Sequence, residues 1–398
     1  MANVFQEIPI EQLCSRVTTG ATPLRSRSDF YEGGTTDWYK TGELKDWYLE
    51  PAEERITKKA LEETSVKLFP ANTVLMAMYG DGRTITSLGM LRAPATTNQA
   101  CSAMLVDEEK CDTRYFFYAL KGRRHLLLKV ASGGAQRNLS GKLIKEFKLP
   151  VPPLPVQRRI AGILSAYDEL MENSHRRIRL LEAMARALYR ECIREAGESA
   201  SAKGILETDC WTFISANVSP YSGTKRYYAT ADIEGLAIHG AGIDYTFAEK
   251  PSRAQKQPTP FSVWFARMKD TYKIAWYSDV NSQSAYSSVL SSGFAGFQPV
   301  EPLYFPLLFL TVSSKDFHAQ KDLFCTGATQ MSLTNEGLSR IEVPAPSKQA
   351  ARQLGEQALP LLNQMLVLQL RIQNLRRTRD LLLPRLLSGR VHQIKTEP

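Results

Sequence analysis

The sequence has little cysteine and histidine, and what it has is scattered. Its 398 residues include six cysteines and five histidines. No Cys-x-x-Cys pair and no His-Glu-x-x-His string occurs, so the spacings typical of zinc sites are missing and no metal site is predicted. Six lone cysteines are also too sparse for a disulfide framework. We therefore expect free thiols and a reducing compartment, the cytoplasm.

Long hydrophobic runs are missing as well. No run of about 18 apolar residues exists, so no membrane span is expected. The first ten residues, MANVFQEIPI, have neither the basic nor the apolar region of a secretory signal. Hydrophobic residues make up 43% and charged residues 23%, the balance of a folded chain of two or three domains. The net charge of +9 fits a nucleic-acid partner, although many proteins without one share it.

Motifs of common catalytic sites are absent. The sequence holds no Gly-x-Ser-x-Gly, no phosphate-binding loop of the required spacing, and no Asn/Asp-Pro-Pro-aromatic turn of an amino-methyltransferase. Triplets such as Glu43-Leu44-Lys45 are similar to nuclease sites but arise often by chance. These absences together favour a protein without catalysis, and an enzyme with an unrecognised site stays open as an alternative.

An internal repeat is present at a spacing of 194 residues. The string GGAQRNLS at residues 133–140 aligns with GATQMSLT at 327–334, and LPVP at 149–152 aligns without a gap with VPAP at 343–346. The front parts align less well, at a spacing of 189, through WYKTGEL at 38–44 and YYATADI at 227–233. The change in spacing implies about five extra residues in the second copy, between roughly 269 and 291.

A 4-3 apolar pattern follows the conserved strings in both copies. A period of 3.5 residues over five heptads predicts a coiled-coil seam. In the first copy, the seam positions are Ile160, Leu164, Tyr167, Met171, Ser174, Ile178, Leu181, Ala185, Leu188 and Cys192. In the second copy, they are Leu354, Ala358, Leu361, Met365, Leu368, Ile372, Leu375, Arg379, Leu382 and Leu386. Only Ser174 and Arg379 break the pattern.

Helix boundary signals place these two helices. The first begins near Pro155 and ends near Gly197, and the second begins after Ser347, a candidate N-cap, and stops near Gly389. Two matched stripes in one chain favour an antiparallel pair within the chain, although a stripe can also dimerise separate chains. We predict domains at 1–152 and 198–346, the latter with a linker at 198–204, and helices at 153–197 and 347–398.

Both front parts mix short strand patterns with helical ones and many turns. Strands are predicted at 73–78, 262–267 and 273–277. Each front part is predicted to be a compact α/β domain. The expected fold class is α+β: two such heads joined by two long helices in an intramolecular antiparallel coiled coil, with pseudo-two-fold symmetry.

Several strings of this sequence resemble those of the specificity subunit of type I restriction–modification enzymes. These strings are SRVTTGATP at 15–23, WYKTGEL at 38–44, KLFP at 67–70, VLMAMYG at 74–80, TTNQAC at 96–101, SSGFA at 291–295 and RDLLLPRLLSG at 379–389. The resemblance covers nearly the whole chain and is weakest at 205–260.

The resemblance implies a function for each part. Each head would be a target recognition domain that reads one half of a bipartite sequence in double-stranded DNA. The helices would fix the spacer and dock two methyltransferase subunits, which carry S-adenosylmethionine, and two restriction subunits could join with ATP and Mg²⁺. This chain would itself bind no cofactor and catalyse nothing.

Base reading needs side chains with paired donors and acceptors on loops that reach the major groove. In the first head the DNA-binding candidates are Thr19, Thr22, Arg25, Arg27, Tyr79, Arg83, Asn98, Gln99, Gln136 and Arg137. In the second head they are Ser222, Thr224, Lys225, Arg226, Lys256, Arg267, Lys269 and Gln330.

Each candidate has a plainer interpretation. Loop arginines are most often only solvated, lysines meet phosphates more often than bases, and Asn98 and Gln99 could satisfy buried backbone groups instead. The whole chain also has a rival hypothesis, a stand-alone two-headed DNA-binding or adaptor protein without an enzyme partner.

Overall fold

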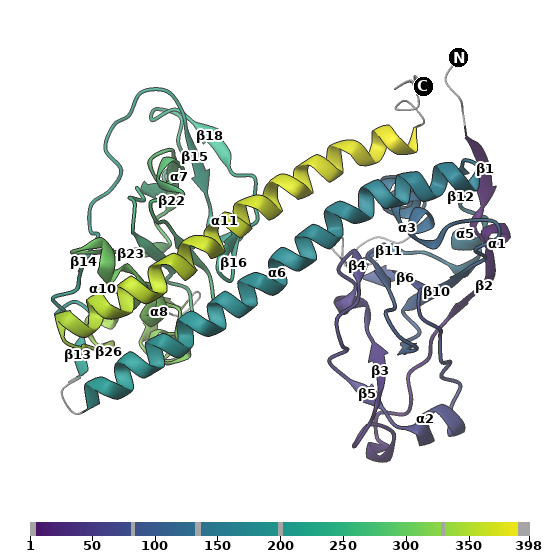
Figure 1. Cartoon of the computed structure of the whole chain (residues 1–398), viewed down its shortest axis with the longest axis horizontal. Helices are drawn as coiled ribbons and strands as arrows, with labels where there is room; N and C mark the ends of the chain where they lie inside the picture. Colours follow the sequence, from purple (N-terminus) through teal and green to yellow (C-terminus); the bar gives the residue numbers. More distant parts are fainter. Residues whose placement is uncertain (1–4, 81–83, 132–136, 198–201, 328–330, 389–398) are drawn as a thin grey trace. The chain divides into compact units, whose positions relative to one another are not determined.

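The computed structural model describes residues 5–80, 84–131, 137–197, 202–327 and 331–388. The chain forms two compact units (Figure 1). Unit 1 comprises Met1–Met171 with Asn374–Pro398, and unit 2 comprises Glu172–Gln373. The predicted heads at 1–152 and 198–346 lie in unit 1 and unit 2 respectively, and each long helix contributes one part to each unit.

Unit 1 contains the following elements before the first long helix: β1 (Gln6–Pro9), α1 (Ile10–Leu13), β2 (Cys14–Thr19), η1 (Ser28–Phe30), β3 (Thr36–Tyr39), η2 (Thr41–Glu43), β4 (Trp47–Tyr48), β5 (Arg55–Ile56), α2 (Lys58–Glu63), β6 (Val74–Ala77), β7 (Tyr79–Gly80), β8 (Leu88–Met90), β9 (Thr96–Thr97), β10 (Cys101–Val106), α3 (Thr113–Gly122), α4 (Arg124–Val130), β11 (Arg137–Asn138), α5 (Gly141–Glu146) and β12 (Lys148–Val151).

Unit 2 contains the following elements between the long helices: β13 (Ala202–Gly204), β14 (Trp211–Phe213), β15 (Lys225–Tyr228), η4 (Thr230–Asp232), β16 (Ile233–Glu234), β17 (Ala237–Ile238), β18 (Ile243–Tyr245), β19 (Ala254–Lys256), β20 (Val263–Ala266), β21 (Ile274–Trp276), α7 (Ser282–Tyr286), β22 (Ser288–Ser291), β23 (Phe294–Pro299), η5 (Pro302–Tyr304), α8 (Phe305–Val312), α9 (Lys315–Leu323), β24 (Cys325–Thr326), β25 (Ser332–Leu333), α10 (Asn335–Ser339) and β26 (Glu342–Pro344).

The main sheets of the two units share one strand order. The order β2-β10-β6-β8 in unit 1 corresponds to β14-β23-β20-β21 in unit 2, and unit 1 adds β4 next to β8. A second sheet also recurs: β3 runs parallel to β9 and antiparallel to β5, as β15 runs parallel to β22 and antiparallel to β18. The second copy adds β19 to this sheet. The strand predictions at 73–78, 262–267 and 273–277 are confirmed by β6, β20 and β21.

The two long helices are α6 (Leu154–Ala196), with 43 residues, and α11 (Lys348–Leu387), with 40. Ser347 caps α11 as predicted, because its Oγ accepts a hydrogen bond from the Ala350 amide at 3.2 Å. The predicted seam residues of both helices are buried or partly buried, since the 3.5-residue period keeps them on one face.

The helices pair antiparallel, as predicted, and Figure 1 shows them side by side. In unit 1, Ile160 and Leu164 near the start of α6 share a core with Leu383 and Leu386 near the end of α11. In unit 2 the ends are reversed, because Cys192 Sγ lies 3.7 Å from the carbonyl oxygen of Ala350. Burial of these apolar faces is the main stabilising contribution to such helices.

Candidate nucleic-acid interface

The candidate residues of the first head gather on the connection between β2 and β3. Thr22 on this connection hydrogen-bonds the side chain of Gln99, which follows β9. The Asn98 side chain accepts a hydrogen bond from the Ala100 amide at 3.2 Å, so it closes a local turn. Thr19 accepts a hydrogen bond from Lys67 Nζ through its backbone oxygen at 3.2 Å.

Arg25 is held in place by its surroundings. Its guanidinium lies 4.8 Å from the ring centroid of Tyr31 and 4.7 Å from that of Trp38, within the range of cation–π attraction. It also pairs with Glu54 at 2.5 Å. This hydrogen bond raises the pKa of Arg25 and lowers the pKa of Glu54, so both groups stay charged.

Arg27 forms a bidentate pair with a neighbouring carboxylate. Its Nε and Nη2 each donate to Asp29 at 2.7 Å, and Nη2 also meets Glu63 at 3.2 Å. The hydrogen bond from Arg27, with a second from Lys59, holds the pKa of Asp29 well below its usual range. Arg27 therefore contacts carboxylates in the free protein rather than being only solvated.

Other candidates of the first head are less fully described. Tyr79 lies in β7, which pairs with β11, and Arg137 lies in β11 opposite Gly80; the side chain of Arg137 is not described. Arg83 and Gln136, like Gln330 of the second head, lie outside the described residues.

The candidates of the second head begin on the corresponding connection, between β14 and β15. Ser222 and Thr224 are exposed on either side of Gly223, whose φ of 73° is a left-handed turn conformation. Lys225 Nζ donates to Gln257 at 2.6 Å. Arg226 forms a bidentate pair with Asp244, at 2.7 Å for each bond, which raises the pKa of Arg226 and lowers that of Asp244.

The remaining cations of the second head contact the chain itself. Lys256 donates to the Ser215 carbonyl and to Asn217, both at 3.1 Å. Arg267 donates to the Leu333 carbonyl at 2.9 Å and to the Asn335 side chain at 2.8 Å, and its burial lowers its pKa. Lys269 Nζ lies 3.8 Å from the sulfur of Met331. Arg267 is thus tied to two neighbouring segments of its own unit.

The carboxylates that pair with these arginines are the residues that sequence reasoning missed. Arg226 and Asp244 are directly opposite each other in the β15–β18 ladder, a cross-strand position that stabilises opposite charges. The strands are too short for their register to be found from the sequence. Glu43 belongs to the triplet that is similar to nuclease sites. In the structure its carboxylate has a structural role, because it accepts hydrogen bonds from the backbone amides of Lys40 and Glu53.

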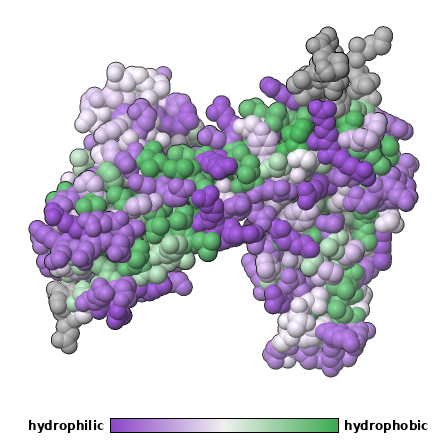
Figure 2. All heavy atoms as spheres, viewed as in Figure 1, coloured by the Kyte–Doolittle hydropathy of each residue, from purple (hydrophilic) through white to green (hydrophobic). Residues whose placement is uncertain are grey.

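The two long helices also expose apolar side chains. These are Ile163, Leu170 and Leu381 in unit 1, and Leu180, Met184, Val367 and Leu370 in unit 2. Figure 2 shows hydrophobic residues at the surface along α11. Exposed apolar patches on a helix face are typical of contact surfaces for other proteins.

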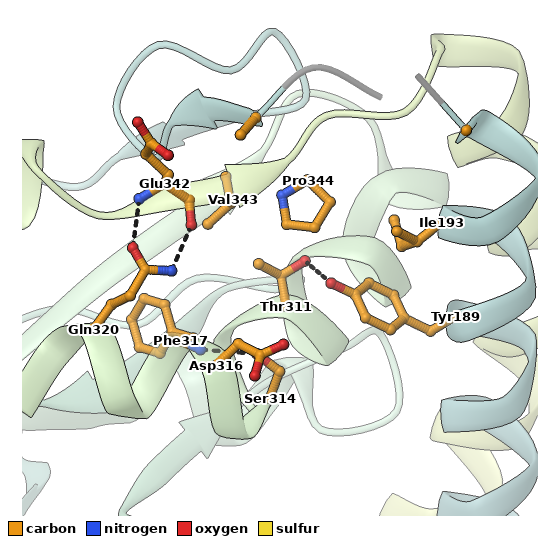
Figure 3. A pocket seen from close by; sticks show the side chains of 12 residues that line it. Tyr189, Ile193, Thr311, Ser314, Asp316, Phe317, Gln320, Glu342, Val343 and Pro344 are labelled. Atoms are coloured by element: carbon orange, nitrogen blue, oxygen red, sulfur yellow. Dashed lines mark hydrogen bonds between the residues drawn. The ribbon is translucent and has the colours of Figure 1, made fainter. Parts of the chain in front are cut away.

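Unit 2 contains a cavity of about 340 Å³ between α6, α8, α9 and β26 (Figure 3). Tyr189 Oη and Thr311 Oγ1 lie 3.2 Å apart across one side of it. Gln320 closes another side with two 2.9 Å hydrogen bonds to the backbone of Glu342. The cavity is lined by Tyr189, Ile193, Gly197, Ala202, Thr311, Ser314, Asp316, Phe317, Gln320, Glu342, Val343 and Pro344.

The described residues contain neither a metal-binding cluster nor a membrane-spanning helix. No group of three or more His, Cys, Asp or Glu side chains that could hold a metal ion occurs among them. Within the same part of the chain, no helix has the length and apolar character that crossing a membrane requires.

Comparison with known proteins identifies the class of the first head. Residues 4–183 match the family model of the type I restriction modification DNA specificity domain. The resemblance that the sequence motifs indicated is therefore confirmed.

The similar curated proteins are type I specificity subunits. The MjaIX specificity subunit of Methanocaldococcus jannaschii is 28% identical over 178 residues, which are 44% of this chain and 40% of that protein. The EcoR124I/EcoR124II specificity subunit of Escherichia coli is 28% identical over 155 residues, 38% of each chain. The aligned regions thus cover about two fifths of the length of each of these relatives.

A solved structure extends the likeness of fold to nearly the whole chain. The S subunit of a type I restriction–modification system from M. genitalium aligns over 97% of both chains with a TM-score of 0.57 and 16% sequence identity. The duplicated heads and paired helices are therefore an architecture that this known subunit shares.

Proposed function

We propose that this chain is a non-catalytic DNA-specificity subunit of a type I restriction–modification complex. Each head reads one half of a bipartite duplex sequence, and the helices set the spacer between the halves. The match of residues 4–183 to a DNA specificity domain, in a chain whose second unit repeats the same sheet order, carries this proposal.

The pairing of the arginines is compatible with DNA contact. Exposed ion pairs such as Arg226–Asp244 stabilise a protein by about 0–1 kcal/mol. A bidentate arginine contact with guanine discriminates by about 1–3 kcal/mol. Replacing the carboxylate contact of Arg25 or Arg226 by a contact with a guanine base is therefore favourable in free energy. The carboxylates left behind would repel phosphates, which favours one defined orientation on the duplex.

Partners supply the chemistry in this proposal. Two methyltransferase subunits carry S-adenosylmethionine, and two restriction subunits use ATP and Mg²⁺. They dock on the exposed apolar side chains of α6 and α11. This chain holds no cofactor, and the complex works in the cytoplasm, where its DNA substrate is found.

The test is selection of duplexes from a random library by the full-length tagged chain purified with whatever binds it. Two short fixed motifs at a constant spacing, with a methyltransferase in the purified complex, are the expected result. A single motif would mean that only one head reads DNA. An intact complex that enriches no sequence would refute the DNA function and leave an adaptor.

Variants then assign the heads. Arg25→Gln should change only one motif, and Arg226→Gln only the other. Arg114→Gln is the matched control: this arginine pairs with Glu169 of α6 at 3.1 Å and should leave both motifs unchanged. A change of both motifs by either head variant would contradict independent reading.

A further inference from the structure

One layer of the helix pair in unit 1 contains a buried ion pair. Asp168 of α6 and Arg379 of α11 hydrogen-bond each other, and their side chains are 4% and 9% exposed. The Tyr118 hydroxyl of α3 donates to the second oxygen of Asp168 at 2.5 Å. Arg379 also contacts Asp380 at 2.7 Å. All groups of this layer therefore have partners.

Arg379 keeps its charge despite its burial. Burial alone lowers the pKa of Arg379, but the charge of Asp168 and the hydrogen bonds outweigh it, so the pKa is raised overall. Burial, together with the charge of Asp168, raises the pKa of Tyr118, so the phenol keeps the proton that it donates. Removing Arg379 would take from the buried Asp168 its ion-pair partner, and removing Asp168 would leave Arg379 with the half-exposed Asp380. Breaking a buried pair in this way is strongly unfavourable.

The corresponding layer of unit 2 is apolar. The spacing of 194 residues places Leu362 at the position of Asp168 and Ala185 at the position of Arg379. Both are fully buried in one hydrophobic cluster. The duplicated chain thus has one ionic and one apolar version of the same layer.

We infer that the Asp168–Arg379 pair makes the first half of this chain accept only the second half as its helix partner. Because the halves are repeats, two first halves could also pair their α6 helices antiparallel, and two second halves their α11 helices. In the first case Asp168 would face Ala185 of the other copy, and in the second Arg379 would face Leu362. Each like pairing breaks two buried ion pairs: the Asp168 carboxylates lose Arg379 in the first case, and in the second the arginines lose Asp168 and keep only Asp380 of their own helix.

The layer therefore distinguishes a first half from a second half. It does not distinguish the second half of the same chain from the second half of another copy. The second half of another copy carries the same arginine and would fit equally well. A polar residue within an otherwise apolar helix interface is a known way to specify pairing. The inference does not depend on what the heads bind.

The test uses the full chain with a protease site placed at 198–201, cleaved after folding. The cleaved protein is incubated in urea below its unfolding midpoint and examined by native mass spectrometry. Only pairs of a first with a second half are expected, with like pairs at least about a hundred-fold less abundant. In Tyr118→Phe/Asp168→Leu/Arg379→Ala, which carries the apolar layer, like pairs should appear. Strict pairing in that variant, or like pairs in the unaltered protein, would overturn the inference.

A surface pair provides the control. Arg114 and Glu169 lie next to this layer, at 43% and 54% exposure, and Arg114→Gln/Glu169→Gln should leave pairing unchanged. Like pairs in this variant would mean that the buried Asp168–Arg379 pair does not determine which halves associate.

A charge exchange gives a second test should the apolar variant not fold. Asp168→Arg/Arg379→Asp keeps an ion pair but reverses it. When this variant and the unaltered protein are cleaved and mixed, each first half should keep to its own kind of second half, because a mixed pair sets like charges together. Mixed pairs at the statistical frequency would refute the selection.

Discussion

Units 1 and 2 share a strand order but differ where the long helices meet the head. In unit 1 this junction is polar, with Asp168, Arg379 and Tyr118 bonded to one another, and α11 closes tightly onto α3. A Cβ on Gly122 would lie 2.4 Å from Leu387 Cδ1. In unit 2 the corresponding layer is apolar, with Leu362 and Ala185 fully buried, and Ile193, which the repeat aligns with Leu387, lines the cavity. Duplication kept the topology, which the backbone hydrogen bonds define, while side-chain packing diverged.

The largest effect on stability is expected when the counterpart of Asp168 in unit 2, Leu362, is replaced by aspartate. Leu362→Asp buries a carboxylate among apolar neighbours and should lower the free energy of unfolding by about 3–5 kcal/mol. Adding Ala185→Arg should recover part of this loss, because the guanidinium supplies a counter-charge to the carboxylate. Urea unfolding with hydrogen exchange measures both. Gln357→Asp on the exposed face of α11 should have little effect, and an equal loss there would contradict the burial argument.

The next effect tests close packing in unit 2. A Cβ on Gly355 of α11 would lie 2.0 Å from the Leu303 carbonyl oxygen, so Gly355→Ala should destabilise unit 2 by about 1–3 kcal/mol. Gly162 of α6 has no neighbour within 4 Å. Gly162→Ala should instead stabilise by roughly 0.5–1 kcal/mol, through helix propensity. Thermal unfolding of both variants distinguishes the steric effect at Gly355 from the helix-propensity effect at Gly162. If both variants changed the melting temperature in the same direction, this explanation would be wrong.

A pH effect is expected in unit 2 from its buried histidine. Burial lowers the pKa of His318 to about 4, whereas an unfolded histidine titrates near 6.5. Since the unfolded state binds the proton first, stability should be constant above pH 6.5 and fall between pH 6.5 and 4, by on the order of 1 kcal/mol for this partly buried ring. Hydrogen exchange of α9 against pH measures this loss. In His318→Phe, which retains ring contacts with Tyr272 and Phe317, the slope should flatten.

The smallest expected effect concerns the cavity. Tyr189→Phe removes the hydrogen bond to Thr311 and should cost about 0.5–1.5 kcal/mol. Denaturant unfolding of unit 2 measures it. Thr311→Val should cost a similar amount, and the double variant should cost less than the sum if the two hydroxyls interact with each other. Additive losses would show that each hydroxyl bonds to water instead.

Local patterns in the sequence predicted much of this molecule. The apolar period located α6 and α11, the repeat predicted their antiparallel pairing, and alternating short runs located β6, β20 and β21. These features depend on neighbouring residues, which the sequence displays directly. The strings in the first half also indicated the DNA specificity family before the fold was known.

The candidate interface was less predictable. The sequence predicts Arg25, Arg27 and Arg226 as DNA-contacting residues. In the structure each of these arginines pairs with a carboxylate, namely Glu54, Asp29 and Asp244 respectively. Their contact with DNA stays a prediction. Strand register and loop packing decide such pairs, and neither can be inferred from strands of two to four residues.

The sequence by itself determined the duplication and the two helices, because repeat spacing and hydrophobic period are local properties of the chain. The sequence placed Arg379 in the seam as a break in the apolar pattern, but only the tertiary structure decided which residue pairs with it. Its partner Asp168 lies 211 residues away along the chain. A buried charge is stable only beside its counter-charge, and which distant residues meet is decided by how the folded segments pack.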